Sequence, residues 1–229
     1  MALLILIPSI AVTSGVEPIA LPYRQTGQFL VGNAASLVQI EVFVDLICED
    51  APHEYYMWKR LLSAGQIAPA EVALKFHVMA SPSHSPWSFT ASVGAQTASA
   101  HGKDAFFSYI ESVWGIAEEF LEHWGDAHYP LSNLTEAQVV AKLAPLAMAA
   151  GVPTSAFYHG MTNRSTIGTN PWAVARGEVK LAASRQVASS PWYFVNGVPY
   201  FEASSGAHLG DAVWLSSIRR LIAEQCISR

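Results

Sequence analysis

A single cysteine, Cys48, stands where an apolar segment predicted to be a buried strand, residues 39–46, gives way to a predicted helix. The start of a helix offers unpartnered backbone N–H groups and a partial positive charge, and both favour a thiolate over a thiol. A Cys-x-x-Cys pair requires a second thiol three residues later, where the chain has Ala51. The sequence therefore predicts a position suited to disulfide chemistry that holds one thiol of the usual two.

The residues that follow Cys48 bear on its reactivity. Glu49 and Asp50 bring two negative charges, which oppose a thiolate. Asp50 is also a good helix N-cap, with Pro52 then in the first turn, and in that register Cys48 lies in the loop outside the field of the helix. His53 compensates if it is protonated and near the sulfur; the alternative is an exposed histidine of the first turn. Both a reactive and an inert thiol stay open at this point.

Composition limits the classes of function. The chain has 229 residues, half of them apolar and 14% charged, which is typical of one sizeable globular core. The formal charge is −5 and no block of basic residues occurs, which argues against nucleic-acid binding. No histidine pair has the i, i+4 spacing of a helical zinc site, and no glycine-rich phosphate loop is present, so we expect neither a metal nor a resident cofactor.

The N-terminal segment has the features of an export signal. Residues 1–12 form an apolar run of the length of a signal-peptide core, and small residues follow up to Gly15, so residues 1–15 are predicted to be a cleaved signal peptide. The alternative is a buried N-terminal strand. Asn133 and Asn163 begin Asn-x-Ser/Thr triplets and are glycan acceptors on that route. These features predict a protein of the secretory pathway, in the ER lumen or outside the cell.

The order of predicted elements is β-α-β, a helical block, and then β-β-α. Short strands are expected near residues 29–31, 39–46 and 72–79, with a helix between the last two. Residues 86–185 are helical in pattern, with a capping box at Thr135 and a cap at Asn170. Apolar runs at 192–195 and 198–201 flank an Asn-Gly turn, which predicts a hairpin whose second strand, containing Pro199, is a sheet edge. A helix over 209–225 ends the pattern.

Three segments, together with this order, resemble the DsbA-like branch of the thioredoxin superfamily. Residues 41–48 match the strand that leads to the nucleophile, 190–199 are similar to the cis-proline loop and its strand, and 32–36 resemble the usual lead-in. The resemblance implies an α/β fold with a thioredoxin-like mixed sheet flanked by helices and a large all-helical insertion. The core is then residues 28–85 and 188–229, and the insertion is residues 86–187.

The resemblance also implies a substrate groove beside Cys48. Pro191 is expected to be cis and to pack next to the cysteine, with Ser190 and Trp192 contacting a bound peptide or glutathione. The alternative for Trp192 is simple packing under the helical block. Asp45 is the acidic residue three before the cysteine and is expected to modulate it. His84, at the start of the helical block, lines the groove or caps a helix.

Ala51 cannot perform the second step of the family's dithiol mechanism, the release of the mixed disulfide. The sequence therefore predicts a monothiol exchanger working through Cys48, with an external thiol such as glutathione as resolver and a cysteine-containing protein or glutathione as partner. One alternative is a redox-inactive peptide-binding or structural module. The other is a relative of the kappa-class glutathione transferases, which have serine at this position. Cys226 is expected at roughly 20 Å or more from Cys48, at the far end of the last helix, as a free thiol or a contact with another chain.

Overall fold

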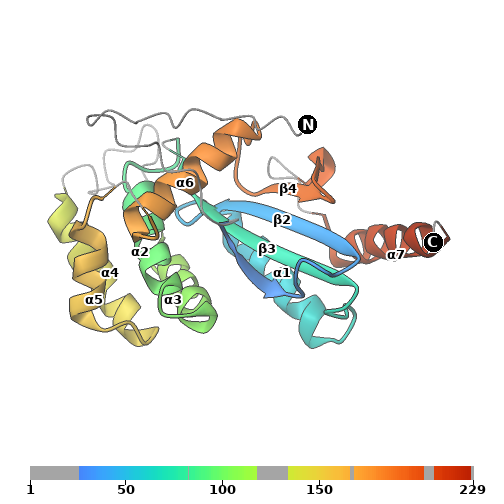
Figure 1. The fold of residues 1–229 in the computed structure, drawn as a ribbon, viewed down its shortest axis with the longest axis horizontal. Helices are drawn as coiled ribbons and strands as arrows, with labels where there is room; N and C mark the ends of the chain where they lie inside the picture. Colours follow the sequence, from blue (N-terminus) through green and yellow to red (C-terminus); the bar gives the residue numbers. More distant parts are fainter. Residues whose placement is uncertain (1–25, 82, 118–133, 166–167, 204–208, 228–229) are drawn as a thin grey trace, which may run out of the picture.

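A five-stranded mixed sheet is the centre of the computed structural model, which describes residues 26–81, 83–117, 134–165, 168–203 and 209–227 (Figure 1). The strand order is β1-β3-β2-β4-β5; β2 and β3 run parallel and every other neighbouring pair is antiparallel. The strands are β1 Gln28–Val31, β2 Val38–Asp45, β3 Val72–Met79, β4 Trp192–Val195 and β5 Val198–Pro199. The predicted mixed sheet is confirmed, while the proposed signal peptide and Asn133 lie outside the described residues.

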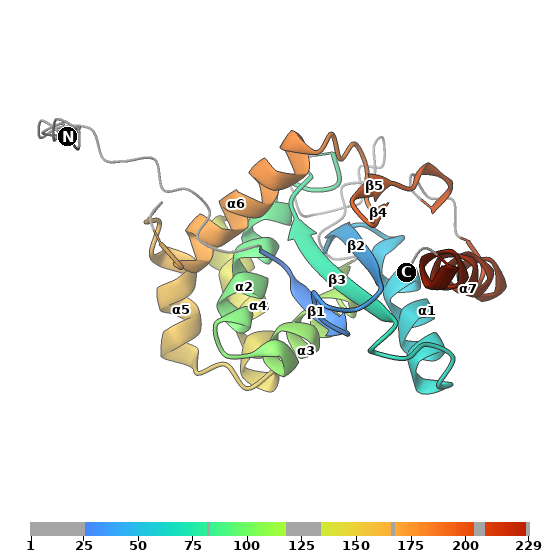
Figure 2. The ribbon, with the colours of Figure 1, turned by 45° about the vertical axis from the view of Figure 1, so that its right-hand side comes forward.

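Seven α-helices surround the sheet within the described residues, and five of them separate β3 from β4 (Figures 1 and 2). They are α1 Ala51–Ser63, α2 Ser88–Ser99, α3 Lys103–Trp114, α4 Glu136–Ala149, α5 Thr154–Thr162, α6 Pro171–Ser184 and α7 Asp211–Ile227. The predicted thioredoxin-like fold with an all-helical insertion is therefore confirmed. Within the described ranges, no helix combines the length and the apolarity that crossing a bilayer requires.

Alternate side chains of the central strand β2 point to the two faces of the sheet. Val38, Ile40, Val42 and Val44 are buried in the larger core, which also contains side chains of α1 and α7. Aromatic rings close this layer: the Trp214 ring of α7 lies 4.8 Å from that of Trp58 in α1 and 4.9 Å from that of Tyr193 in β4. Figure 2 shows α1 and α7 on the same side of the sheet.

The opposite face of the sheet, under α6, combines a small apolar cluster with charged side chains. Glu41 on β2 lies 3.2 Å from the Nε2 of His77 on β3, and it accepts a hydrogen bond of 2.8 Å from Arg185. The other ring nitrogen of His77 lies 2.9 Å from Glu178 of α6, which is fully buried. Burial opposes the ionisation of Glu41, but its hydrogen bonds to His77 and Arg185 prevail and lower its pKa to about 2. This network ties α6 to the sheet.

Local signals in the sequence account for several element ends. Thr135 forms the predicted capping box with Gln138, and the Asn170 side chain accepts a hydrogen bond of 2.9 Å from the Trp172 amide. Asn196 and Gly197 take positive φ angles of 50° and 81°, as a two-residue hairpin turn demands. The strand β5 is the predicted sheet edge. It covers only two of the four expected residues, because a 3-10 helix begins at residue 201.

Candidate functional site

Cys48 lies in the loop between β2 and α1, not at the start of the helix. The amide of Cys48 donates to the carbonyl of Asp45 over 3.1 Å, and the amide of Ala51 donates to the carbonyl of Cys48 over 3.4 Å. The helix begins at Ala51 with Asp50 at the N-cap position and Pro52 in its first turn. The expectation of a helix starting at Cys48 is thus wrong, and the alternative register is correct, although the Asp50 side chain makes no capping hydrogen bond. Cys48 therefore precedes the first residue of α1 by three positions and lies outside the partial positive charge at the start of that helix.

The sulfur of Cys48 contacts the loop that contains Pro191. The distance from Cys48 Sγ to the carbonyl oxygen of Ser190 is 3.2 Å, and the Ser190–Pro191 peptide bond is cis. The hydroxyl of Ser190 accepts a hydrogen bond of 2.8 Å from the Asp45 amide, which fixes the loop against the end of β2. The Cys48 side chain is 3% exposed and Pro191 is buried. Segments more than 140 residues apart therefore meet at this sulfur, in the arrangement that the resemblance implies.

Asp45 connects the Cys48 loop to the segment that follows β3. Its carboxylate is fully buried and accepts hydrogen bonds from the amide of Ile47 over 2.9 Å and from the amide of Ser81 over 2.7 Å. The oxygen that contacts Ser81 also lies 3.1 Å from Nδ1 of His84. One carboxylate therefore sets the positions of two loops and one ring.

His84 is placed between Asp45 and Cys48. The hydrogen bond to Asp45, and then the interaction with Cys48, raise the pKa of His84 to about 10, which favours the charged ring at neutral pH. The side chain is 25% exposed, which leaves it partly accessible from outside. It lies four residues before α2, so the alternative of a helix cap is wrong. The other expectation, that His84 lines a substrate groove, stays a prediction.

The other predicted site residues differ in how far they are exposed. Glu49 and His53 are exposed, and Asp50 is half-buried at the start of α1. Trp192 is 7% exposed and lies in the small apolar cluster under α6, which also contains Phe43. Trp192 therefore packs under the helical block, as one alternative had it, and its contact with a bound substrate stays a prediction.

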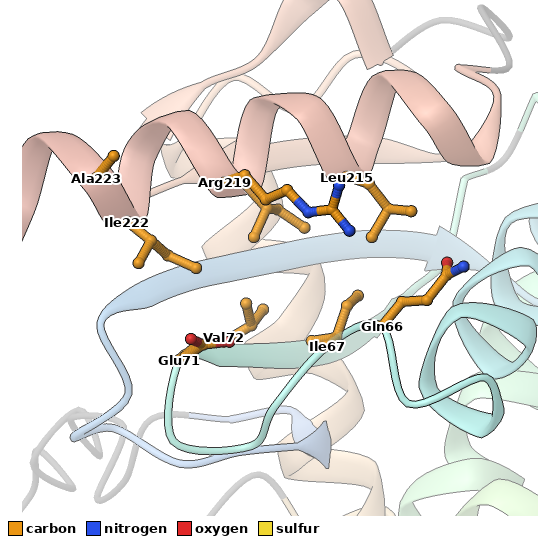
Figure 3. A pocket seen from close by; sticks show the side chains of 9 residues that line it. Gln66, Ile67, Glu71, Val72, Leu215, Arg219, Ile222 and Ala223 are labelled. Carbon is orange, nitrogen blue, oxygen red and sulfur yellow. The ribbon is translucent and has the colours of Figure 1, made fainter.

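Two hollows in the described surface lie beside α7 rather than at Cys48. One, of about 270 Å³, is lined by α7 and by the segment between α1 and β3, including Ile67 and Arg219 (Figure 3). The other, of about 450 Å³, lies between α7 and the β4–β5 hairpin. Neither is lined by Cys48 or Ser190. The candidate site is therefore a buried sulfur with a partly exposed histidine beside it.

Comparison with known proteins supports the fold through structure alone. No family model matches the chain, and no curated protein matches it. It is similar in structure to a candidate protein-disulfide isomerase from Pseudomonas syringae, with 17% identity, a TM-score of 0.63 and coverage of 82% of this chain and 96% of the other.

Two further solved structures show the same likeness. The thiol-disulfide exchange protein alpha-DsbA2 from Wolbachia pipientis is 13% identical, with a TM-score of 0.60 and coverage of 86% of this chain and 88% of that one. BdbD from Bacillus subtilis is 12% identical, with a TM-score of 0.59 and coverage of 84% and 91%. The chain therefore has the DsbA-like form of the thioredoxin fold, with alanine at position 51 where a dithiol site has its second cysteine.

Proposed function

We propose that the protein is a thiol–disulfide exchange protein that works as a monothiol through Cys48. The observation that carries the proposal is the contact of 3.2 Å between the Cys48 sulfur and the carbonyl of Ser190, next to the cis peptide bond at Pro191. A disulfide that pairs with the backbone of this loop would have its sulfur atoms brought to Cys48. The similarity in fold to proteins described as a protein-disulfide isomerase and a thiol-disulfide exchange protein supports the same chemistry.

The reaction needs two substrates because the chain offers one thiol at the site. In the first step, the thiolate of Cys48 attacks a disulfide, a bond forms between Cys48 and one sulfur, and the other sulfur leaves as a thiolate. In the second step, the thiolate of an external thiol such as glutathione attacks the mixed disulfide and releases Cys48. The net result is exchange of one disulfide for another. Ala51 is fully buried in the core and cannot serve as an internal resolver.

The proposed setting is an exported protein. The apolar run of residues 1–12 supports a cleaved leader, and the triplets at Asn133 and Asn163 would then be open to glycosylation. A disulfide exchanger functions where disulfides persist, which is in such compartments. The mass and the N-terminal residue of the mature protein, measured after expression in a secreting cell, test this part of the proposal.

One observation favours a different function, a redox-inactive module that keeps the fold. Cys48 is only 3% exposed, and its contact with the Ser190 carbonyl suits a protonated thiol. Reaction of Cys48 with a thiol reagent separates the two functions. An inert sulfur in the folded protein supports the module, and a reactive one supports exchange.

Deglutathionylation of a small mixed disulfide, coupled to glutathione reductase, tests the proposed function directly. The comparison is between the wild-type protein, Cys48→Ser and Cys226→Ser, the last being the matched control. We expect Cys48→Ser to reduce turnover to the uncatalysed background and Cys226→Ser to leave it unchanged. Turnover that survives in Cys48→Ser would overturn the assignment.

A further inference from the structure

His84 is a group that the dithiol pattern does not predict, and Asp45, which contacts it, also binds the backbone of the proposed nucleophile, Cys48. We propose that His84, oriented by Asp45, is the catalytic acid–base residue of exchange at Cys48. It stabilises the thiolate, gives its proton to the leaving thiolate, and regains one from the external thiol. This inference rests on the proposed function and names a catalytic residue for it.

The geometry limits the freedom of the histidine. The Asp45 carboxylate is fully buried and is held by the amides of Ile47 and Ser81 at 2.9 and 2.7 Å, so it is a fixed acceptor. His84 Nδ1 lies 3.1 Å from this carboxylate, and the amide of Cys48 donates to the carbonyl of the same Asp45 over 3.1 Å, so one residue holds the ring and the cysteine next to each other. Both ring nitrogens of an imidazolium are donors, so the charged ring suits a carboxylate and a thiolate at once.

The other neighbours of the sulfur act against a thiolate. The carbonyl oxygen of Ser190 accepts from the thiol and repels a negative sulfur, and the next two residues in the chain are the acidic Glu49 and Asp50. The start of α1 is one turn away. The cation at His84 supplies the attraction that these groups do not, in the way that a histidine partner lowers the pKa of cysteine in other sites.

The interactions of His84 with Asp45 and Cys48 make it a stronger acid once Cys48 has joined the mixed disulfide, which is when the leaving sulfur takes up a proton. Its pKa is raised to about 10 by Asp45 and by Cys48 together. When Cys48 becomes part of a mixed disulfide, its negative charge is lost and one of the two causes disappears. The pKa of His84 then falls, and the ring releases its proton more readily to the departing thiolate.

Each exchange step balances with this proton. Cys48 thiolate bonds to one substrate sulfur, the substrate disulfide breaks, and the departing sulfur takes the proton of His84 to leave as a neutral thiol. The external thiol then gives its proton to the neutral ring of His84, and its thiolate bonds to the sulfur attached to Cys48. Cys48 leaves as a thiolate beside the restored imidazolium. One sulfur of the substrate disulfide ends as a free thiol, and the other ends in a mixed disulfide with the external thiol.

The test is the pH dependence of Cys48 alkylation by iodoacetamide in the full chain, with Cys226→Ser in every variant so that one thiol reports. His84→Gln is compared with the parent, with His84→Asn as a second variant of different size, and with His101→Gln as a matched control on an exposed histidine. We expect the alkylation profile of both His84 variants to move at least about one unit to higher pH, which is about a tenfold loss of rate near neutrality. Circular dichroism checks that each variant is folded.

Alkylation does not require a disulfide substrate, so its outcome is distinct from that of the proposed function. Profiles of the His84 variants that superimpose on the parent, or a parent whose Cys48 does not react at any pH in the folded state, would overturn the inference. A shifted profile in a protein without exchange turnover would keep the thiolate–imidazolium pair and reject the exchange function. With turnover present, we expect His84→Gln to slow exchange most for disulfides whose leaving thiol is most basic.

Discussion

Replacing Asp45 by asparagine perturbs the fold and the site through the same atoms. The Oδ1 atom of the carboxylate accepts a hydrogen bond from the Ile47 amide. The Oδ2 atom accepts from the Ser81 amide and from His84. An asparagine side chain has one oxygen, so its NH₂ group must face a donor in either orientation. If the oxygen turns toward Ser81 and His84, the amide of Ile47 is left buried without an acceptor.

The expected cost follows from those contacts. A buried donor without a partner costs about 1–3 kcal/mol, and a hydrogen bond to a charged group is stronger than a neutral one by about 1 kcal/mol. We therefore expect Asp45→Asn to lower the free energy of unfolding by about 2–4 kcal/mol, a large share of the roughly 5–15 kcal/mol of an ordinary protein. The loss of the anionic acceptor also lowers the pKa of His84, because the hydrogen bond to Asp45 is the largest cause of its raised value.

Urea unfolding followed by tryptophan fluorescence measures the change in stability, with the slope of the transition checked for constancy. Asp104→Asn is the matched control, since Asp104 is exposed in the first turn of α3 and should change stability by only a few tenths of a kcal/mol. If Asp45→Asn unfolds within about 0.5 kcal/mol of the parent, the assigned hydrogen bonds do not exist in solution. Asp45 would then not hold His84 or the loop after β3 in the positions described.

Two further changes test the packing of α6 and α1 on the sheet. Glu41→Gln is expected to cost roughly 2–3 kcal/mol near neutral pH; since the pKa of Glu41 is lowered from 4.5 to about 2, this contribution is present above pH 4.5 and lost between 4.5 and 2. Urea titrations at several pH values should show the difference from the parent closing over that range, and a constant difference would contradict the assignment. Tyr193→Phe removes the acceptor of Trp58 Nε1, at 3.0 Å, and a donor to the buried Glu54, at 2.7 Å. We expect a loss of about 2–4 kcal/mol in the same assay, and an unchanged midpoint would show that neither bond stabilises the fold.

Local patterns in the sequence predicted the order of the elements, and the family resemblance then supplied the fold. Alternation along residues 38–44 places valine and isoleucine on one face of β2, and this periodicity is a property of the strand itself. The hairpin at Asn196 and the capping box at Thr135 are likewise set by neighbouring residues. The proline segment at 190–199 and the order of elements then sufficed to identify the arrangement of the sheet.

The chemistry around Cys48 depends on contacts between distant segments, which local patterns do not contain. The loop after β3 is held against the end of β2 because the Ser81 amide and the His84 ring both bind the Asp45 carboxylate. In the sequence, the histidine between two serines is equally suited to a helix cap. Trp192 is a similar case: its place in the strand is predicted, but its burial depends on the helix α6 that covers it.

Alanine at position 51, in place of a second cysteine, changes what exchange at Cys48 requires. It leaves the Cys48 thiol and the cis-proline loop in place. A second thiol at that position would release a bound substrate and would also act as a proton donor next to Cys48. Ala51 supplies neither, and its methyl group is fully buried in the core. Release can come from a thiol in solution, but a proton donor speeds the departure of the leaving sulfur only if it is already in place. Asp45 places His84 there through its carboxylate, and its backbone amide donates a hydrogen bond to the hydroxyl of Ser190 in the loop of Pro191. The loop that would receive a substrate and the ring that would protonate it are therefore positioned by one residue, so a change at Asp45 should alter binding and proton transfer together.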